Sequence, residues 1–147
     1  MRNLLIFIIF AFLISTQALT IDDLMDAIHQ VETGGKTGAI LGDYDKVNKT
    51  YRALGPLQIW KSFYDDAKEY DVQTGGKFLL TQTSYQDCAS LIISKRVALA
   101  YFNRYAKKAI KSNDYEKLSR IFNGGPNGDR KTSTVIYWKK VQKYLYF

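Results

Sequence analysis

Glu32 is the first residue whose type and position suggest chemistry. Leu24, Met25 and Ile28 recur at helical spacing before it, and Glu32 continues the same apolar stripe. On an apolar face and at the negative end of a helix, the pKa of a carboxyl group is raised by burial and by the helix dipole. Such a group can serve as a general acid near neutral pH. The alternative is an ordinary helix-end glutamate, exposed or paired with a lysine such as Lys36.

Two aspartates follow in the next segment. Asp43 and Asp45 lie 11 and 13 residues after Glu32. Glycosidases pair a carboxylic acid with a second carboxylate, which acts as a nucleophile or activates water. Asp43 or Asp45 could supply such a second carboxylate, and a plain turn aspartate is the alternative. His29 precedes Glu32 by three residues, but because the chain has a single histidine we expect no metal and no cofactor.

The elements that must position these residues are mostly helical. Thr20 and Asp23 predict a capped first helix that Gly34 and Gly35 end. The segment 36–54 has no helical stripe and predicts a loop or a small irregular sheet. Further helices are predicted from Pro56 to about residue 67, from about Ser84 to Ile110, from Asn113 and Asp114 through Ile121, and over the last residues from Val135 to Leu145. The sequence thus predicts one mainly α domain with a small irregular or β region beside the site.

The N-terminus has the pattern of a secretory signal peptide. Arg2 precedes an apolar run, residues 4–14, which is followed by polar residues and the small Ala18. We expect cleavage after residue 18 and a domain over residues 19–147. A retained membrane anchor is the alternative, although the run is shorter than the roughly 20 residues that a spanning helix needs. Cys88 has apolar neighbours and predicts a buried thiol rather than a nucleophile or an intermolecular disulfide.

The positive net charge indicates which kinds of partner the protein could attract. The chain of 147 residues carries a formal net charge of +7, so an exported form would be attracted to anionic wall polymers, membranes or nucleic acid. Charge alone does not choose among these, and a merely soluble basic surface is the alternative.

Three short motifs resemble those of a known group of enzymes. The sequence reads VETGG around Glu32, GPLQI from Gly55 to Ile59, and IFNGGP from Ile121 to Pro126. In order and rough spacing they resemble the lytic transglycosylase and goose-type lysozyme group. The final TSTVIYWKKV is similar to the closing helix of that group, with Tyr137 at its tyrosine.

The resemblance implies a lysozyme-like domain that cuts the β-1,4 link between N-acetylmuramic acid and N-acetylglucosamine in peptidoglycan. It implies that Glu32 is the catalytic acid and that Tyr137 faces its carboxyl group. It further implies that the sugar site is lined by Gln58 and Ile59 and closed by Asn123 and Gly124. Gly42-Asp43 matches a Gly-Asp dipeptide that positions water in the goose-type enzymes, so the resemblance makes Asp43 the candidate second carboxylate.

The chain departs from that pattern at several positions. Thr33 replaces a serine, Phe122 replaces a tyrosine, and Pro56 enters the Gly-Leu-Met-Gln segment. Trp60 occupies the place of a second aspartate. None of these changes removes the acid, so we expect an active enzyme. If no base works, a sugar hydroxyl attacks internally and leaves an anhydro ring.

The sequence therefore predicts a secreted, monomeric muramidase that acts on peptidoglycan strands at an anionic bacterial surface and does not bind nucleic acid. The alternatives are a cationic wall-binding or antimicrobial protein on the same fold without turnover, and a chitin- or chitosan-cutting relative.

Overall fold

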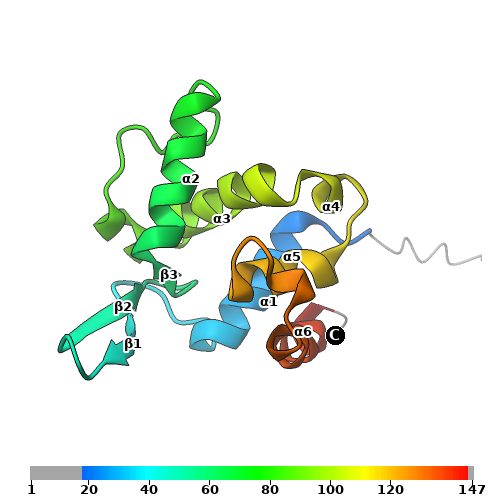
Figure 1. The fold of residues 1–147 in the computed structure, drawn as a ribbon, viewed down its shortest axis with the longest axis horizontal. Coiled ribbons are helices and arrows are strands. Elements are labelled where there is room, and N and C mark those ends of the chain that lie inside the picture. Colours follow the sequence, from blue (N-terminus) through cyan, green and yellow to red (C-terminus); the bar gives the residue numbers. More distant parts are fainter. Residues whose placement is uncertain (1–17, 146–147) are drawn as a thin grey trace, which may run out of the picture.

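A computed structural model describes residues 18–145 (Figure 1). The predicted signal peptide falls almost wholly outside these residues, as do the last two residues. The helices are α1 (Ile21–Thr33), α2 (Lys61–Gln73), α3 (Leu91–Tyr105), α4 (Lys107–Lys111), α5 (Tyr115–Gly124) and α6 (Ser133–Leu145), with short 3-10 helices η1 (Tyr85–Ala89) and η2 (Gly128–Arg130). The strands are β1 (Leu41–Asp45), β2 (Thr50–Leu54) and β3 (Ile59–Trp60).

Helix α1 forms as the sequence predicts. The Thr20 side chain accepts from the Asp23 backbone N–H, and the Asp23 carboxylate accepts from the Thr20 backbone N–H, so the N-terminus has a full capping box. Gly34 ends the helix with a φ of 64°, a left-handed conformation that glycine adopts without steric cost. Glu32 therefore lies in the last turn of a helix with fixed ends.

The segment after α1 folds into a small antiparallel sheet with strand order β1-β2-β3. The register pairs Leu41 with Leu54 and Tyr44 with Tyr51, whose rings are in contact at 5.0 Å between centroids. This confirms the predicted small β region. The sheet projects from the helices as a hairpin (Figure 1).

The predicted helix start at Pro56 is wrong, because α2 begins at Lys61. Gly55 and Gln58 both have positive φ values, 82° and 49°, which an α-helix cannot contain. The Gln58 backbone N–H donates to the Gly55 carbonyl, and Ile59 then pairs with β2. Residues 55–60 thus form a turn and a third strand.

The predicted long helix from Ser84 to Ile110 is also wrong, because three pieces replace it. Ser84 and Asp87 do form a capping box, but it begins only η1. The backbone is extended at Ser90, with a ψ of 129°, and the helix breaks again at Ala106, with a φ of −139°. No glycine or proline marks either break, so the periodicity continues through them.

Helix α3 is the centre of the core. Val97, Tyr101 and Phe102 are buried on it, and it packs against α2, α5 and α1. The Cys88 thiol is buried beside this helix, which confirms the predicted buried cysteine, and burial raises its pKa to about 12. Within residues 18–145, no helix has both the length and the apolar character needed to cross a membrane.

Candidate active site

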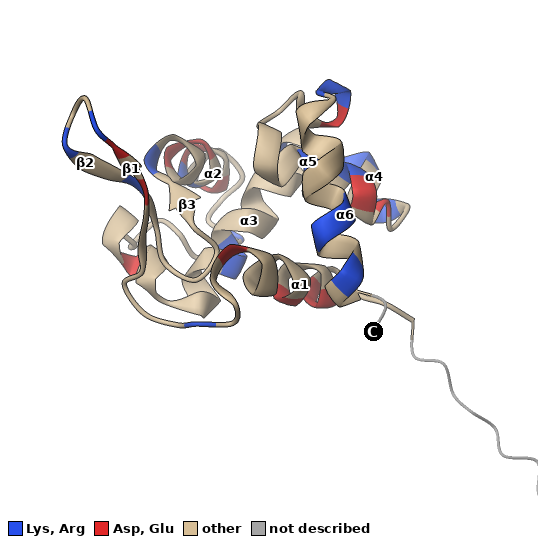
Figure 2. Cartoon of the chain, turned by 90° about the horizontal axis from the view of Figure 1, so that it is seen from below, with Lys and Arg blue, Asp and Glu red and all other residues tan. Residues whose placement is uncertain are grey.

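A cleft of about 750 Å³ separates the sheet and α2 from α1, α5 and α6. In Figure 2, β1 and β2 lie on one side of the molecule, and α5 and α6 lie on the other. Most of the residues predicted to form the site line this cleft, although four different regions of the chain supply them. They are Glu32, Asp43, Gln58, Ile59, Asn123 and Gly124.

Glu32 is mostly buried, and one strong hydrogen bond holds it. The Tyr137 hydroxyl on α6 donates to Glu32 Oε1 at 2.6 Å. Burial raises the pKa of Glu32 above its ordinary value of 4.5, while the Tyr137 hydrogen bond and the charge of Lys140 partly oppose this shift. The balance favours a carboxyl group that keeps its proton to a higher pH than an exposed glutamate does.

Tyr137 lies behind Glu32 and is absent from the lining of the cleft. Its side chain is almost wholly buried, and burial together with the neighbouring Glu32 carboxylate raises the pKa of the phenol well above its usual range. The hydroxyl therefore stays protonated and acts as a fixed donor. A residue 105 positions away in the sequence thus sets the orientation of the candidate acid.

Asp43 stands on the opposite side of the cleft, on β1. It has a φ of 52°, and its carboxylate pairs with Arg52 Nη2 at 2.9 Å. The Arg52 guanidinium also lies over the Trp60 ring, 4.9 Å from the ring centroid. Asp43 is thus supported by a chain of exposed contacts rather than by burial.

Asp45 stabilises the turn of the hairpin. Its carboxylate accepts from the backbone N–H groups of Val47 and Asn48 and from the Asn48 side chain. These bonds lower its pKa, the Asn48 side chain contributing most. Asp45 thus holds the hairpin turn and does not line the cleft, whereas Asp43 does.

Gln58 braces the base of the hairpin. Its Nε2 donates to the carbonyls of Ile40 and Gly55, at 3.1 and 2.9 Å. Its Oε1 rests against Gly42, where an added Cβ would lie only 1.6 Å away. Both amide protons are thus used within the protein, so Gln58 shapes the cleft through the backbone it holds. Ile59 lines the cleft with a buried side chain, and its carbonyl accepts from Tyr85.

The end of α1 is tied to this segment. The Thr33 hydroxyl donates a hydrogen bond to the Pro56 carbonyl at 3.0 Å. The threonine that replaces the expected serine thus connects α1 to the turn before β3. His29 is buried, and its Nε2 lies 2.7 Å from the Lys36 carbonyl. Among residues 18–145, no three His, Cys, Asp or Glu side chains are grouped as a metal site would require.

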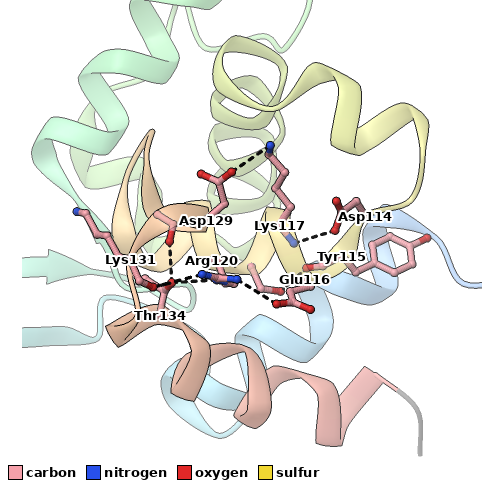
Figure 3. Close-up of polar contacts among 10 residues, drawn as sticks. Asp114, Tyr115, Glu116, Lys117, Arg120, Asp129, Lys131 and Thr134 are labelled. Atoms are coloured by element: carbon pink, nitrogen blue, oxygen red, sulfur yellow. Dashed lines mark hydrogen bonds and ion pairs between the residues drawn. The ribbon is translucent and has the colours of Figure 1, made fainter.

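Asn123 and Gly124 are the last two residues of α5, and Arg120 holds the loop that follows them. Arg120 donates to Thr134 Oγ1 at 3.1 Å and to the Lys131 carbonyl at 3.3 Å (Figure 3). The Thr134 hydroxyl in turn lies 2.7 Å from the Gly128 carbonyl. The sequence motif identified the loop but missed the arginine and threonine that fix it, because they lie outside the motif.

Aromatic side chains form one wall of the cleft. Phe63 stacks on Tyr101 at 3.6 Å between centroids and meets Phe122 edge-on at 5.3 Å. Trp60 is 45% exposed at the cleft. Asp66 and Lys131 also line the cleft and were not identified from the sequence. Nothing in their sequence context distinguishes them from surface charges.

The chain is similar in sequence to several known proteins. No model of a protein family matches the chain. It is 44% identical to lysozyme 1 of Crassostrea virginica over 59 residues, which are 40% of this chain and 32% of that protein. It is 37% identical to a lysozyme of Magallana gigas over 92 residues, 62% of this chain and 59% of that protein. The chain thus spans about one third to three fifths of these two curated relatives.

Two solved structures share the arrangement of elements. Tapes japonica lysozyme matches with a TM-score of 0.63 at 22% identity, over 82% of this chain and 87% of that chain. Meretrix lusoria lysozyme, in complex with the protein PliI of Aeromonas hydrophila, matches with a TM-score of 0.61 at 25% identity, over 84% and 89%.

The chain therefore has a lysozyme-like fold, mainly helical with a small three-stranded antiparallel sheet. Its relatives in sequence include lysozymes of bivalves and an invertebrate-type lysozyme of Caenorhabditis elegans. They support the predicted superfamily and do not single out the goose-type or lytic transglycosylase branch.

Proposed function

We propose that this protein is a muramidase, a glycosidase that cleaves the β-1,4 link between N-acetylmuramic acid and N-acetylglucosamine in peptidoglycan. The observation that carries the proposal is the environment of Glu32: a partly buried carboxyl group with a raised pKa, hydrogen-bonded to Tyr137 and open to the cleft. Similarity to bivalve lysozymes supports the same reaction.

Glu32 acts as the general acid in this proposal. With its proton retained, it protonates the glycosidic oxygen as the bond to the anomeric carbon breaks. The Tyr137 hydroxyl then stabilises the carboxylate that forms, because a hydrogen bond to the charged form favours it. Trp60 is partly exposed at the cleft, with Arg52 over its ring, and offers an aromatic surface to a sugar.

Asp43 is the proposed second carboxylate, and it positions the attacking water or stabilises positive charge at the anomeric carbon. Asp43 lines the cleft on the side opposite Glu32, and its carboxylate pairs with Arg52. The competing route needs no second carboxylate: the 6-hydroxyl of the muramic acid attacks, and Glu32 acts first as acid and then as base. The products, hydrolytic or anhydro, separate these routes.

The setting of the reaction is part of the proposal. We propose a secreted monomer, released by cleavage after residue 18, that meets the anionic bacterial wall. Cleavage removes Arg2, which lowers the net charge of the full chain from +7 to +6. This charge and the lysines of α6 support attraction to such a surface (Figure 2).

The direct test is to incubate purified peptidoglycan with the wild-type protein and with Glu32→Gln, and to identify the soluble products by mass spectrometry. The expected result is release of muropeptides by the wild type only. Glu69→Gln is the matched control, because Glu69 is an exposed glutamate on α2 outside the cleft. Products one water lighter than hydrolysed muropeptides would identify internal transfer.

Two outcomes of this experiment would replace the proposal. No release by the wild type, combined with retention on the wall, would indicate a cationic wall-binding protein without turnover. Cleavage of N-acetylglucosamine oligomers with no cleavage of peptidoglycan would indicate a chitin-cutting enzyme. Equal release by wild type and Glu32→Gln would remove Glu32 from the mechanism.

A further inference from the structure

The charges that line the cleft are unevenly divided. Three are carboxylates, Glu32, Asp43 and Asp66. Among the described residues that line the cleft, Lys131 is the one lysine or arginine. Arg52 lies nearby, but its guanidinium is engaged with Asp43. A ligand group that is itself negative therefore finds one cation in this cleft.

Lys131 has a fixed backbone and a side chain that reaches the cleft. Its carbonyl accepts from Arg120, so the main chain is held by the network of the α5–α6 loop. Its side chain extends away from Arg120 and Thr134 (Figure 3), and its Nζ donates to the Gly124 carbonyl at 2.6 Å. The ammonium is thereby placed next to the turn that carries Asn123.

The partner of this ammonium is a neutral carbonyl, as it is for Lys68, whose Nζ donates to the Thr83 carbonyl. Lys95 pairs with Asp22 and Asp26, and Lys117 pairs with Asp129. Within residues 18–145, no carboxylate forms an ion pair with Lys131, which instead contacts a neutral carbonyl. An ammonium has three N–H donors, and a hydrogen bond to a carboxylate is stronger than one to a neutral oxygen.

We propose that Lys131 is a specificity-determining residue that binds a carboxylate carried by the glycan. The proposal rests on the proposed function and deepens it. Chitin chains carry no carboxylate, whereas peptidoglycan strands carry them on the muramic acid substituent. Lys131 thus favours peptidoglycan over a glycan of N-acetylglucosamine alone.

Two sources can supply the carboxylate in peptidoglycan. One is the free lactyl carboxylate of a muramic acid without its peptide, and the other is a carboxylate of the attached peptide. Both present the same chemistry to the ammonium, so glycans with and without peptides are needed to tell them apart.

The test measures binding, so it does not depend on turnover. In a Glu32→Gln background, calorimetry compares Lys131 with Lys131→Gln on three ligands of equal sugar number: peptide-free muramyl glycan, muramyl glycan with peptides, and an N-acetylglucosamine oligomer. We expect Lys131→Gln to weaken binding of at least one muramyl ligand roughly tenfold, as for the loss of a charged hydrogen bond. Binding of the N-acetylglucosamine oligomer should stay unchanged.

Matched controls separate recognition from support of the loop. Lys77→Gln removes an exposed lysine outside the cleft lining and should leave binding of all three ligands unchanged. Lys131→Arg keeps the charge and should retain most of the preference for the muramyl ligand.

Equal weakening of all three ligands by Lys131→Gln would mean that Lys131 only supports the Gly124 turn, and this result would overturn the proposal. No weakening of any ligand would overturn it as well. Failure of the muramidase proposal looks different, because it appears as an absence of cleavage by the wild type while Lys131-dependent binding persists.

Discussion

The two candidate carboxylates are held in opposite ways. Glu32 lies in the last turn of α1, is mostly buried, and has one hydrogen bond, from the Tyr137 hydroxyl. Asp43 lies on the projecting hairpin with 36% of its side chain exposed and is paired with Arg52. The helical side of the cleft therefore supports a carboxyl group by removing water, and the hairpin side supports one by supplying a countercharge.

This difference fits the proposed roles of the two residues. Burial disfavours the carboxylate form of Glu32 and raises its pKa, whereas Asp43 is accessible to water and pairs with the Arg52 guanidinium. Glycosidases that use two carboxyl groups need one as an acid and the other as a carboxylate. Similar responses of Glu32 and Asp43 to substitution would contradict this difference in roles.

The largest expected effect is the unequal cost of removing each carboxylate. Glu32→Gln should lower kcat/KM on peptidoglycan about 10³-fold, because the leaving oxygen loses its proton donor. Asp43→Asn should lower it by roughly 10- to 100-fold, because water and the sugar can still approach the anomeric carbon. Steady-state kinetics on soluble muropeptide oligomers measures both.

The control for that pair is Asp45→Asn, the same substitution on the same strand outside the cleft, and it should leave kcat/KM near the wild-type value. Equal losses for Glu32→Gln and Asp43→Asn would contradict the division of roles. An unchanged rate in Asp43→Asn with anhydro products would move the reaction to the internal route.

The second effect concerns the hydrogen bond between the two helices. Tyr137→Phe removes the donor that favours the Glu32 carboxylate, so the pKa of Glu32 should rise further. The alkaline limb of the kcat–pH profile, where the acid loses its proton, should move to higher pH. The maximal rate should fall about tenfold, because the carboxyl group loses its fixed orientation.

Tyr144→Phe is the matched control on the same helix, since Tyr144 is exposed. Its pH profile should match the wild type. An alkaline limb of Tyr137→Phe that stays in place or moves to lower pH would show that Tyr137 does not set the protonation of Glu32.

The third effect is on stability. Because the pKa of Glu32 is raised in the folded protein, its contribution to the free energy of unfolding is present below the ordinary value of 4.5 and is lost as pH rises through the folded pKa. Glu32→Gln does not undergo this loss. The melting temperature of the variant relative to wild type should therefore rise, by roughly 2–5 °C, between pH 4 and neutral pH.

Calorimetric scans at pH 4 and pH 7 measure this change, with Glu69→Gln as the exposed control. A constant difference between Glu32→Gln and wild type at the two pH values would mean that burial does not shift the pKa of Glu32.

The smallest effect is expected on the hairpin. Arg52→Met removes the countercharge of Asp43, but the pair is exposed and screened by salt. The expected loss in kcat/KM is threefold or less. Because salt screens the pair, the loss should be largest at low salt and close to experimental error at high salt. Arg52→Lys should retain most of the wild-type rate. A loss in Arg52→Met as large as that in Asp43→Asn would show that Asp43 depends wholly on its partner.

The limits of the sequence are clearest at residues 55–60 and 84–110. Pro56 suits the start of a helix, but the positive φ at Gln58 is a non-local result, since the amide of Gln58 is held by Ile40 and Gly55. The breaks at Ser90 and Ala106 likewise carry no local signal. The periodicity of apolar residues predicts which face of a helix is buried, but it does not predict whether the helix is continuous.

The sequence by itself determined α1, its capping box and its glycine stop, because these depend on residues within a few positions of one another. It also determined that a carboxylate ends the apolar stripe of that helix. Only the tertiary structure decided what this carboxylate meets. Tyr137 lies 105 positions away, and the Asp43–Arg52 pair and the Lys131 ammonium reach the cleft from two other regions. Burial and countercharge depend on which surfaces come together, and this is a property of the folded chain.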